Sequence, residues 1–139
     1  MAVEQMSPGV LATILLKNAE EKDASKREDI VVIDVRDDDW KGGNIKGSIN
    51  VPSWRFPDKL EDLLKEHKDR KAIVFHCMFS QQRGPRAARA FSQALASKHK
   101  DSKCKVYYLT GGWRAWAATY IKSEKRDLLI ENLDPKVWG

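Results

Sequence analysis

A cysteine and an arginine separated by five residues lie in a stretch that has the composition of an anion-binding loop. The stretch is His76-Cys77-Met78-Phe79-Ser80-Gln81-Gln82-Arg83-Gly84-Pro85. A thiolate is a strong nucleophile, and a guanidinium can grip two oxygens of an oxyanion at once. Backbone N–H groups of a tight loop and of a helix N-terminus add further donors, and their positive potential favours the thiolate. We therefore identify Cys77 and Arg83 as candidate catalytic residues. The candidate substrate-binding residues are Met78, Phe79, Ser80, Gln81, Gln82 and Arg83.

Several of these residues also have an ordinary structural explanation. A cysteine at a strand end is most often simply buried, and Cys-x5-Arg alone is a weak signal. The full string is much stronger evidence when it lies between a buried strand and a helix. Ser80 is equally suited to bind the thiolate or to satisfy a loop amide. His76 should point away from the pocket because side chains alternate along a strand, and Cys104 is expected to be an ordinary residue at the opposite end of the sheet.

The elements that position the loop are predicted from hydrophobic patterning. Apolar runs predict strands at 30–35, 72–75 and 106–109, with a shorter strand at 48–51. Helical spacing and start signals predict helices over 7–18, 58–67, 84–98 and 113–120. Residues 121–139 are predicted to form a surface tail with a helical turn near 127–132. This alternation predicts one α/β domain over residues 1–139, with a central parallel sheet and helices on both faces, and ligands at the carboxyl ends of the strands.

Composition and charge exclude several classes of protein. The 139 residues are 42% hydrophobic and 32% charged, unlike disordered, collagen-like or membrane chains. Apolar runs are too short for a bilayer, and the N-terminus lacks a leader pattern, so we expect a cytoplasmic or nuclear protein without a membrane partner. Two cysteines fit neither a disulfide framework nor a metal site. Residues 76–105 carry seven basic side chains and one acidic one, but no interleaved aromatic series, so nucleic acid is not expected as a partner.

Three segments resemble the rhodanese-fold family. The string 76–86 is similar to the active-site string of the cell-cycle dual-specificity phosphatases of the M-phase inducer type, and its His-Cys-x-x-Ser-x-x-Arg pattern is shared with small eukaryotic arsenate reductases. Segments 33–36 and 43–50 resemble the first rhodanese signature, and 109–113 resembles the Gly-Gly turn near the end of the domain. The resemblance implies a rhodanese-like fold in which Cys77 is the nucleophile and Arg83 binds the oxyanion. The five-residue interval is associated with phosphate- and arsenate-handling members, whereas sulfurtransferases usually have four.

The sequence also departs from the pattern that the resemblance supplies. Met78 and Gln82 stand where the cell-cycle phosphatases have acidic residues, so leaving-group protonation needs help from the aspartates at 37–39. Asn44 replaces a usual histidine, and Val35 stands where those phosphatases have a second cysteine. The tail has none of the cysteines with which plant relatives bind zinc, so no metal is expected.

The expected function is therefore that of a small cysteine-dependent protein phosphatase. It would act on phosphotyrosine, with phosphothreonine as a second candidate, through a phosphocysteine intermediate. The alternative is an arsenate reductase that needs glutathione as its reductant; otherwise no cofactor is expected. A thiosulfate-type sulfurtransferase or a non-catalytic rhodanese-type binding module ranks third. The expected partner is a phosphorylated protein or a small oxyanion, and the sequence gives no oligomeric state.

Overall fold

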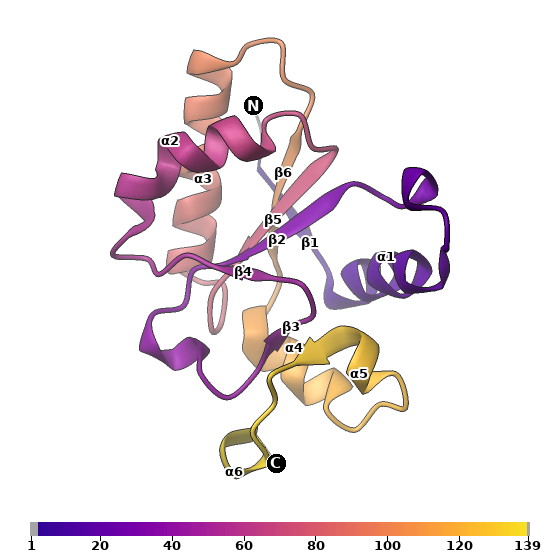
Figure 1. Ribbon diagram of the computed structural model, residues 1–139. Coiled ribbons are helices and arrows are strands. Elements are labelled where there is room, and N and C mark those ends of the chain that lie inside the picture. The colour runs from indigo at the N-terminus through magenta and orange to yellow at the C-terminus, as the bar shows by residue number, and fades with distance from the viewer. Residues whose placement is uncertain (1–2, 139) are drawn as a thin grey trace.

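The protein is built around a sheet of five parallel strands (Figure 1). The structure, a computed structural model, describes residues 3–138. The strand order is β1-β6-β5-β2-β4, with bounds Glu4–Met6, Lys105–Leu109, Ala72–His76, Ile30–Asp34 and Ile49–Asn50. Because β5 and β2 run in the same direction and Asp34 pairs with His76, the segments that follow these two residues emerge side by side at one edge of the sheet.

The helices lie in two layers, one on each face of the sheet (Figure 1). Helices α2 and α3 cover one face, and α1, α4 and α5 lie on the other. The bounds are α1 Pro8–Glu20, α2 Phe56–His67, α3 Arg83–Lys98, α4 Gly112–Tyr120, α5 Arg126–Leu129 and α6 Pro135–Trp138, with 3₁₀ turns η1 Ala24–Lys26 and η2 Asp38–Trp40. Within residues 3–138, no helix combines the length and apolar character needed to cross a bilayer.

Two apolar cores hold these layers together. Side chains alternate along β5, so Ile73 and Phe75 pack toward α2 and α3, while Val74 faces α1 and α4. Phe75 contacts the rings of Phe56 and Phe91, and all three are buried. A strand that is buried on both faces explains why the sequence of β5 is continuously apolar rather than alternating.

The predicted elements of the sheet and its covering helices are confirmed, with ends that shift by one or two residues. α1 continues to Glu20, β5 to His76, and α2 starts at Phe56. The prediction omits β1, which pairs with β6 at the edge of the sheet. Two of its three residues, Glu4 and Gln5, are exposed, so no run of apolar residues marks this strand.

The C-terminal segment differs from the predicted surface tail. The helical turn is α5, at Arg126–Leu129, and strand β7, Ile130–Glu131, follows it and pairs antiparallel with β3, Asn44–Ile45. Leu129 and Ile130 are buried, and Leu129 accepts a hydrogen bond through its carbonyl from the Trp116 indole. This buried contact attaches the segment to the core, which is why the expectation of a tail was wrong here.

Candidate active site

The loop between β5 and α3 carries the residues predicted to do chemistry. Cys77 follows β5 directly, and Arg83 is the first residue of α3. Gly84 allows the helix to begin against the strand, because a Cβ there would lie 3.0 Å from the His76 Cα and 3.1 Å from the Cys77 nitrogen. The loop is therefore forced to turn tightly between the nucleophile candidate and the arginine.

The N-terminus of α4 fixes the orientation of two peptide groups of this loop. The N–H of Trp113 donates to the Cys77 carbonyl and the N–H of Arg114 to the Met78 carbonyl, both at 2.9 Å. Gly112 has φ +58°, and a Cβ at this position would collide with the Cys77 carbonyl oxygen and lie 2.7 Å from that of Met78. Because trans peptides point N–H and C=O in opposite directions, the N–H groups of Met78 and Phe79 point away from α4.

The sulfur of Cys77 lies inside this turn. The side chain is 3% exposed, and its Sγ accepts a hydrogen bond from the Ser80 N–H at 3.2 Å. Ser80 has φ +54°, a left-handed conformation that bends the loop back over the sulfur. Among the described residues, the Ser80 Oγ is buried without a hydrogen-bond partner, so the structure favours neither role weighed for this hydroxyl.

The guanidinium of Arg83 is paired with carboxylates from the loop after β2. Its Nη1 and Nη2 contact the two oxygens of Asp39 at 3.0 and 2.9 Å, and Nη1 lies 3.5 Å from Asp37. Hydrogen bonding to Asp39 raises the pKa of Arg83, and the same contact holds the pKa of Asp39 below its ordinary value. Both side chains are about one-third exposed, so solvent reaches this pair.

Arg36 supports the segment that carries Asp39. Its buried guanidinium forms an ion pair with Asp34 at 2.8 Å and donates to the carbonyls of Asp39 and Gly43 at 3.1 and 2.8 Å. It also stacks over Trp113, with the guanidinium carbon 4.9 Å from the ring centre. Through these contacts, residues 34–36 connect β2, the turn at Asp39 and α4. They belong to the segment that resembles the first rhodanese signature.

The remaining predicted residues have different exposures. Phe79 is 52% exposed, Gln81 and Gln82 are exposed, and Met78 is half-buried against the α4 side of the core. A hollow of about 250 Å³ opens beside Arg83 over Phe56 and Ala87. Phe79 and this hollow border the loop with apolar surface.

His76 and Cys104 lie where the sequence places them. His76 is fully buried on the face opposite Cys77, and burial lowers the pKa of its imidazole despite the nearby Asp34. Burial also raises the pKa of the Cys104 thiol to about 11. Counting along the paired strands, Cys104 lies six positions from Cys77, or about 20 Å at 3.3 Å per residue. Both cysteines are free.

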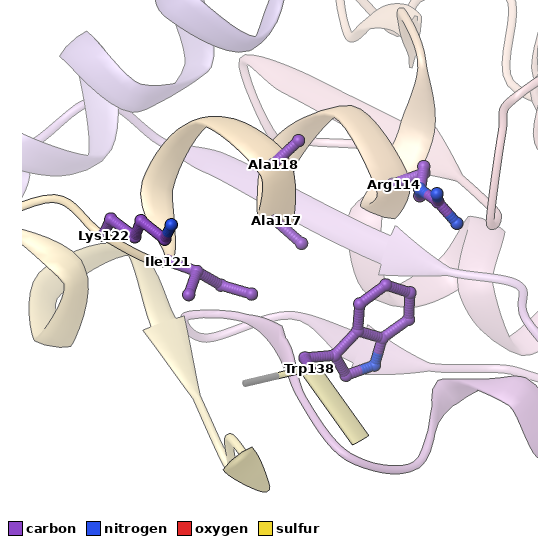
Figure 2. Close-up of a pocket in the computed structure, with 6 residues that line it drawn as sticks. All are labelled: Arg114, Ala117, Ala118, Ile121, Lys122 and Trp138. Atoms are coloured by element: carbon purple, nitrogen blue, oxygen red, sulfur yellow. The ribbon is translucent and has the colours of Figure 1, made fainter. Parts of the chain in front are cut away.

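A separate hollow of about 380 Å³ lies between α4 and α6 (Figure 2). Figure 2 shows Trp138 across from Ala117 and Ile121, with Arg114 and Lys122 at the two ends. Its lining residues come from the C-terminal part of the chain, and the Cys77 loop lies outside it.

The chain is similar to several known proteins. The model of the rhodanese-like domain family matches residues 16–119, and the chain belongs to this family. The dual specificity phosphatase ibp1 of Schizosaccharomyces pombe is 35% identical over 107 residues, which cover 66% of this chain and 78% of that one. Arsenate reductase 2.1 of rice, Oryza sativa, is 34% identical over 89 residues, covering 63% of this chain and 56% of the rice protein. The structure of yeast Ygr203w, described as a protein tyrosine phosphatase of the rhodanese family, superposes with a TM-score of 0.78 at 28% identity, covering 100% of this chain and 99% of that one.

Sequence reasoning did not identify the pairing of Arg83 with Asp39. It weighed the aspartates at 37–39 only as proton donors. One signal could have shown the pairing: β2 and β5 are predicted neighbours, so an acidic run after one strand and an arginine after the other emerge at the same sheet edge.

Proposed function

We propose that the protein is a cysteine-dependent phosphatase of phosphorylated proteins, acting on phosphotyrosine and secondarily on phosphothreonine. The proposal rests on the Cys77 loop. The carbonyls of Cys77 and Met78 accept hydrogen bonds from α4, and the loop ends at Arg83. Helix α3 begins with no acidic residue in its first turn and without a side-chain cap in the described structure, so its N-terminus is available to an anion.

In the first step, the Cys77 thiolate attacks phosphorus. A sulfur–phosphorus bond forms as the bond to the leaving oxygen breaks, and that oxygen keeps the electron pair. Arg83 and the N–H groups of the loop hold the three equatorial oxygens, whose charge is redistributed in the transition state. The N–H groups of Met78 and Phe79 suit this task because the carbonyls of the same two peptide groups, those of Cys77 and Met78, are hydrogen-bonded to α4.

In the second step, water hydrolyses the phosphocysteine. The water oxygen bonds to phosphorus, the sulfur–phosphorus bond breaks, and Cys77 returns to the thiolate with release of inorganic phosphate. Phe79 and the apolar hollow beside Arg83 are the surfaces available to the aromatic part of the substrate.

Proton donation to the leaving group is the weak part of this site. Met78 and Gln82 cannot donate a proton, and the contact with Arg83 keeps the pKa of Asp39 low, so Asp39 is ionised near neutral pH. A phenoxide leaves without a proton far more readily than an alkoxide. Aryl phosphates are therefore the appropriate test substrates, and phosphotyrosine is favoured over phosphothreonine.

Arsenate reduction is the second candidate, because a relative that bears that name aligns with the chain. Arsenate would bind in place of phosphate, and Cys77 would form an arsenic–sulfur bond as one arsenate oxygen leaves as water. Reduction of arsenic(V) to arsenic(III) needs two electrons, which two glutathione thiols supply as they become a disulfide, with water breaking the arsenic–sulfur bond so that arsenite is released and Cys77 returns to the thiol. An external thiol is required because Cys104 is about 20 Å from Cys77 at 3.3 Å per strand residue. We place either reaction in the cytoplasm or nucleus, where thiols stay reduced.

One parallel assay separates these functions. Purified protein is given an aryl phosphate, arsenate with glutathione, or thiosulfate with cyanide, and the Cys77→Ser variant serves as the control in each arm. The proposal requires Cys77-dependent release of phosphate from the aryl ester. Turnover of arsenate alone would indicate an arsenate reductase instead of a phosphatase, and turnover of thiosulfate alone would indicate a sulfurtransferase.

A further inference from the structure

The clamp of the proposed site already holds a ligand from its own chain. The planar guanidinium of Arg83 binds both oxygens of Asp39, at 3.0 and 2.9 Å. This two-point contact is the one that a guanidinium makes to two oxygens of a phosphate group. In the described structure, Asp39 thus occupies the donors that the proposed mechanism assigns to the substrate.

The segment around Asp39 is anchored, while the carboxylate itself is accessible. The Asp39 carbonyl accepts a hydrogen bond from Arg36, and the Asp37 carboxylate accepts bonds from the Ser53 N–H and Oγ at 2.7 to 2.9 Å. These contacts fix the backbone of the turn. The Asp39 side chain is 35% exposed, and its Oδ1 also accepts a hydrogen bond from the Asp37 N–H at 2.9 Å. Rotation of the side chain away from Arg83 gives up this hydrogen bond, while the Arg36 and Ser53 contacts still hold the turn.

We propose that Asp39 is an internal competitor for the oxyanion clamp and sets the affinity of the site. An incoming oxyanion must displace the carboxylate from Arg83, and the displaced charge stays on the same anchored turn. Displacing the carboxylate costs binding free energy. Only a ligand with at least two oxygens and more than one negative charge regains that free energy from Arg83, so the site selects tetrahedral dianions such as phosphate monoesters and arsenate. This inference rests on the proposed function, because it takes Arg83 to be the clamp.

A supporting role for Asp39 leads to the opposite expectation. If the carboxylate oriented Arg83 for the substrate, its removal would weaken anion binding. If it competes, its removal frees Nη2, leaves Nη1 with the 3.5 Å contact to Asp37, and removes a nearby negative charge, so binding becomes tighter. The substitution Asp39→Asn keeps the size of the side chain without its charge, and it therefore separates the two roles.

The experiment measures binding of tungstate and of inorganic phosphate by titration calorimetry, without turnover. Wild type is compared with Asp39→Asn, with Asp39→Ser as a second variant, and with Asp38→Asn, which removes an equal charge from the exposed neighbouring side chain. Thermal unfolding checks that each variant is folded. We expect both Asp39 variants to bind about tenfold more tightly, the ratio that 1.4 kcal/mol of lost competition gives, and Asp38→Asn to change binding less than twofold.

The possible failures are distinguishable. Unchanged or weaker binding by both Asp39 variants, while wild type still binds tungstate, would overturn the competition and leave the proposed phosphatase intact. An equal gain in Asp38→Asn would also overturn it, because the effect would then be general charge rather than occupation of Arg83. Absence of binding in wild type and in every variant would contradict both the inference and the clamp.

Discussion

At the scale of single residues, the site combines a buried sulfur with a solvent-accessible arginine. Cys77 is 3% exposed, whereas the Arg83 side chain is 31% exposed and already holds two carboxylate oxygens. The sequence identified both residues as candidates from their types and spacing. It could not predict that Arg83 is occupied by Asp39, since three adjacent aspartates compete for this role and only the turn of η2 selects between them.

Replacing Arg83 with lysine tests the two-point contact. An ammonium keeps the positive charge but cannot present two parallel N–H groups to two oxygens. We expect kcat/KM for an aryl phosphate to fall by about a hundredfold or more, the effect of losing one transition-state donor. Arg89→Lys on the exposed side of α3 is the matched control and should keep wild-type activity. If Arg83→Lys keeps near wild-type kcat/KM, the oxyanion is bound elsewhere.

At the scale of elements, the N-terminus of α4 determines the shape of the Cys77 loop. The Gly111-Gly112 turn was recognised from the sequence as a family feature, but its reason lies in packing: Gly112 has to pass against the carbonyls of Cys77 and Met78. Such a contact joins residues far apart in the chain and leaves no local pattern in the sequence. The same holds for β3 and β7, which are two residues each and are defined only by their pairing.

Alanine substitution of two glycines separates the effect of backbone strain from the effect of a Cβ that collides with the Cys77 and Met78 carbonyls. Gly112 and Gly47 both have positive φ, +58° and +77°, but a Cβ at Gly47 has nothing within 4 Å. We expect Gly47→Ala to cost about 1 kcal/mol of unfolding free energy with activity retained. Gly112→Ala should cost roughly 3 kcal/mol and abolish turnover, because overpacking adds to the strain and the loop must shift. If urea denaturation gives the same loss of unfolding free energy for both variants, and both keep their activity, the contact with α4 does not shape the loop.

At the scale of the whole molecule, the sequence predicted the parallel sheet and both helix layers because buried strands and amphipathic helices have strong local patterns. It failed for the C-terminal segment, where Leu129 and Ile130 are buried by contacts with distant parts of the chain. The burial of His67 was equally hidden: it is 3% exposed, although it ends a predicted helix and has charged residues on both sides in the sequence. His76, 0% exposed, follows the apolar run 72–75, and its strand position was predicted.

These two histidines should make stability depend on pH. Burial lowers the pKa of both imidazoles below the ordinary 6.5, so below that pH the unfolded chain binds more protons than the folded one. The histidine contribution to the unfolding free energy should level off near pH 7.5 and fall below pH 6.5 by up to about 1.4 kcal/mol per unit for each histidine. Urea denaturation between pH 5 and 8 checks this, and His67→Gln should reduce the slope. Stability that rises as the pH falls through 6 would refute the assignment.

The distance across the sheet should determine how the protein responds to oxidation. Cys104 is about 20 Å from Cys77 at 3.3 Å per strand residue, far beyond the ~7 Å between Cα atoms that a disulfide allows. Peroxide should therefore convert Cys77 to sulfinate or sulfonate, and dithiothreitol should restore activity only partly. Peptide mass spectrometry checks the product. An intramolecular Cys77–Cys104 disulfide would contradict the arrangement of β5 and β6, and Cys104→Ser should oxidise like wild type.

Trapping the phosphocysteine intermediate shows whether Cys77 forms a covalent bond to phosphorus. Wild-type protein is mixed with a phosphorus-labelled aryl phosphate, quenched within the first turnover, digested and analysed by mass spectrometry. We expect the label on the peptide that contains Cys77, and no label in the Cys77→Ser variant treated in the same way. Label on any other residue, or full turnover with no labelled peptide and no loss of activity in Cys77→Ser, would show that Cys77 is not the nucleophile.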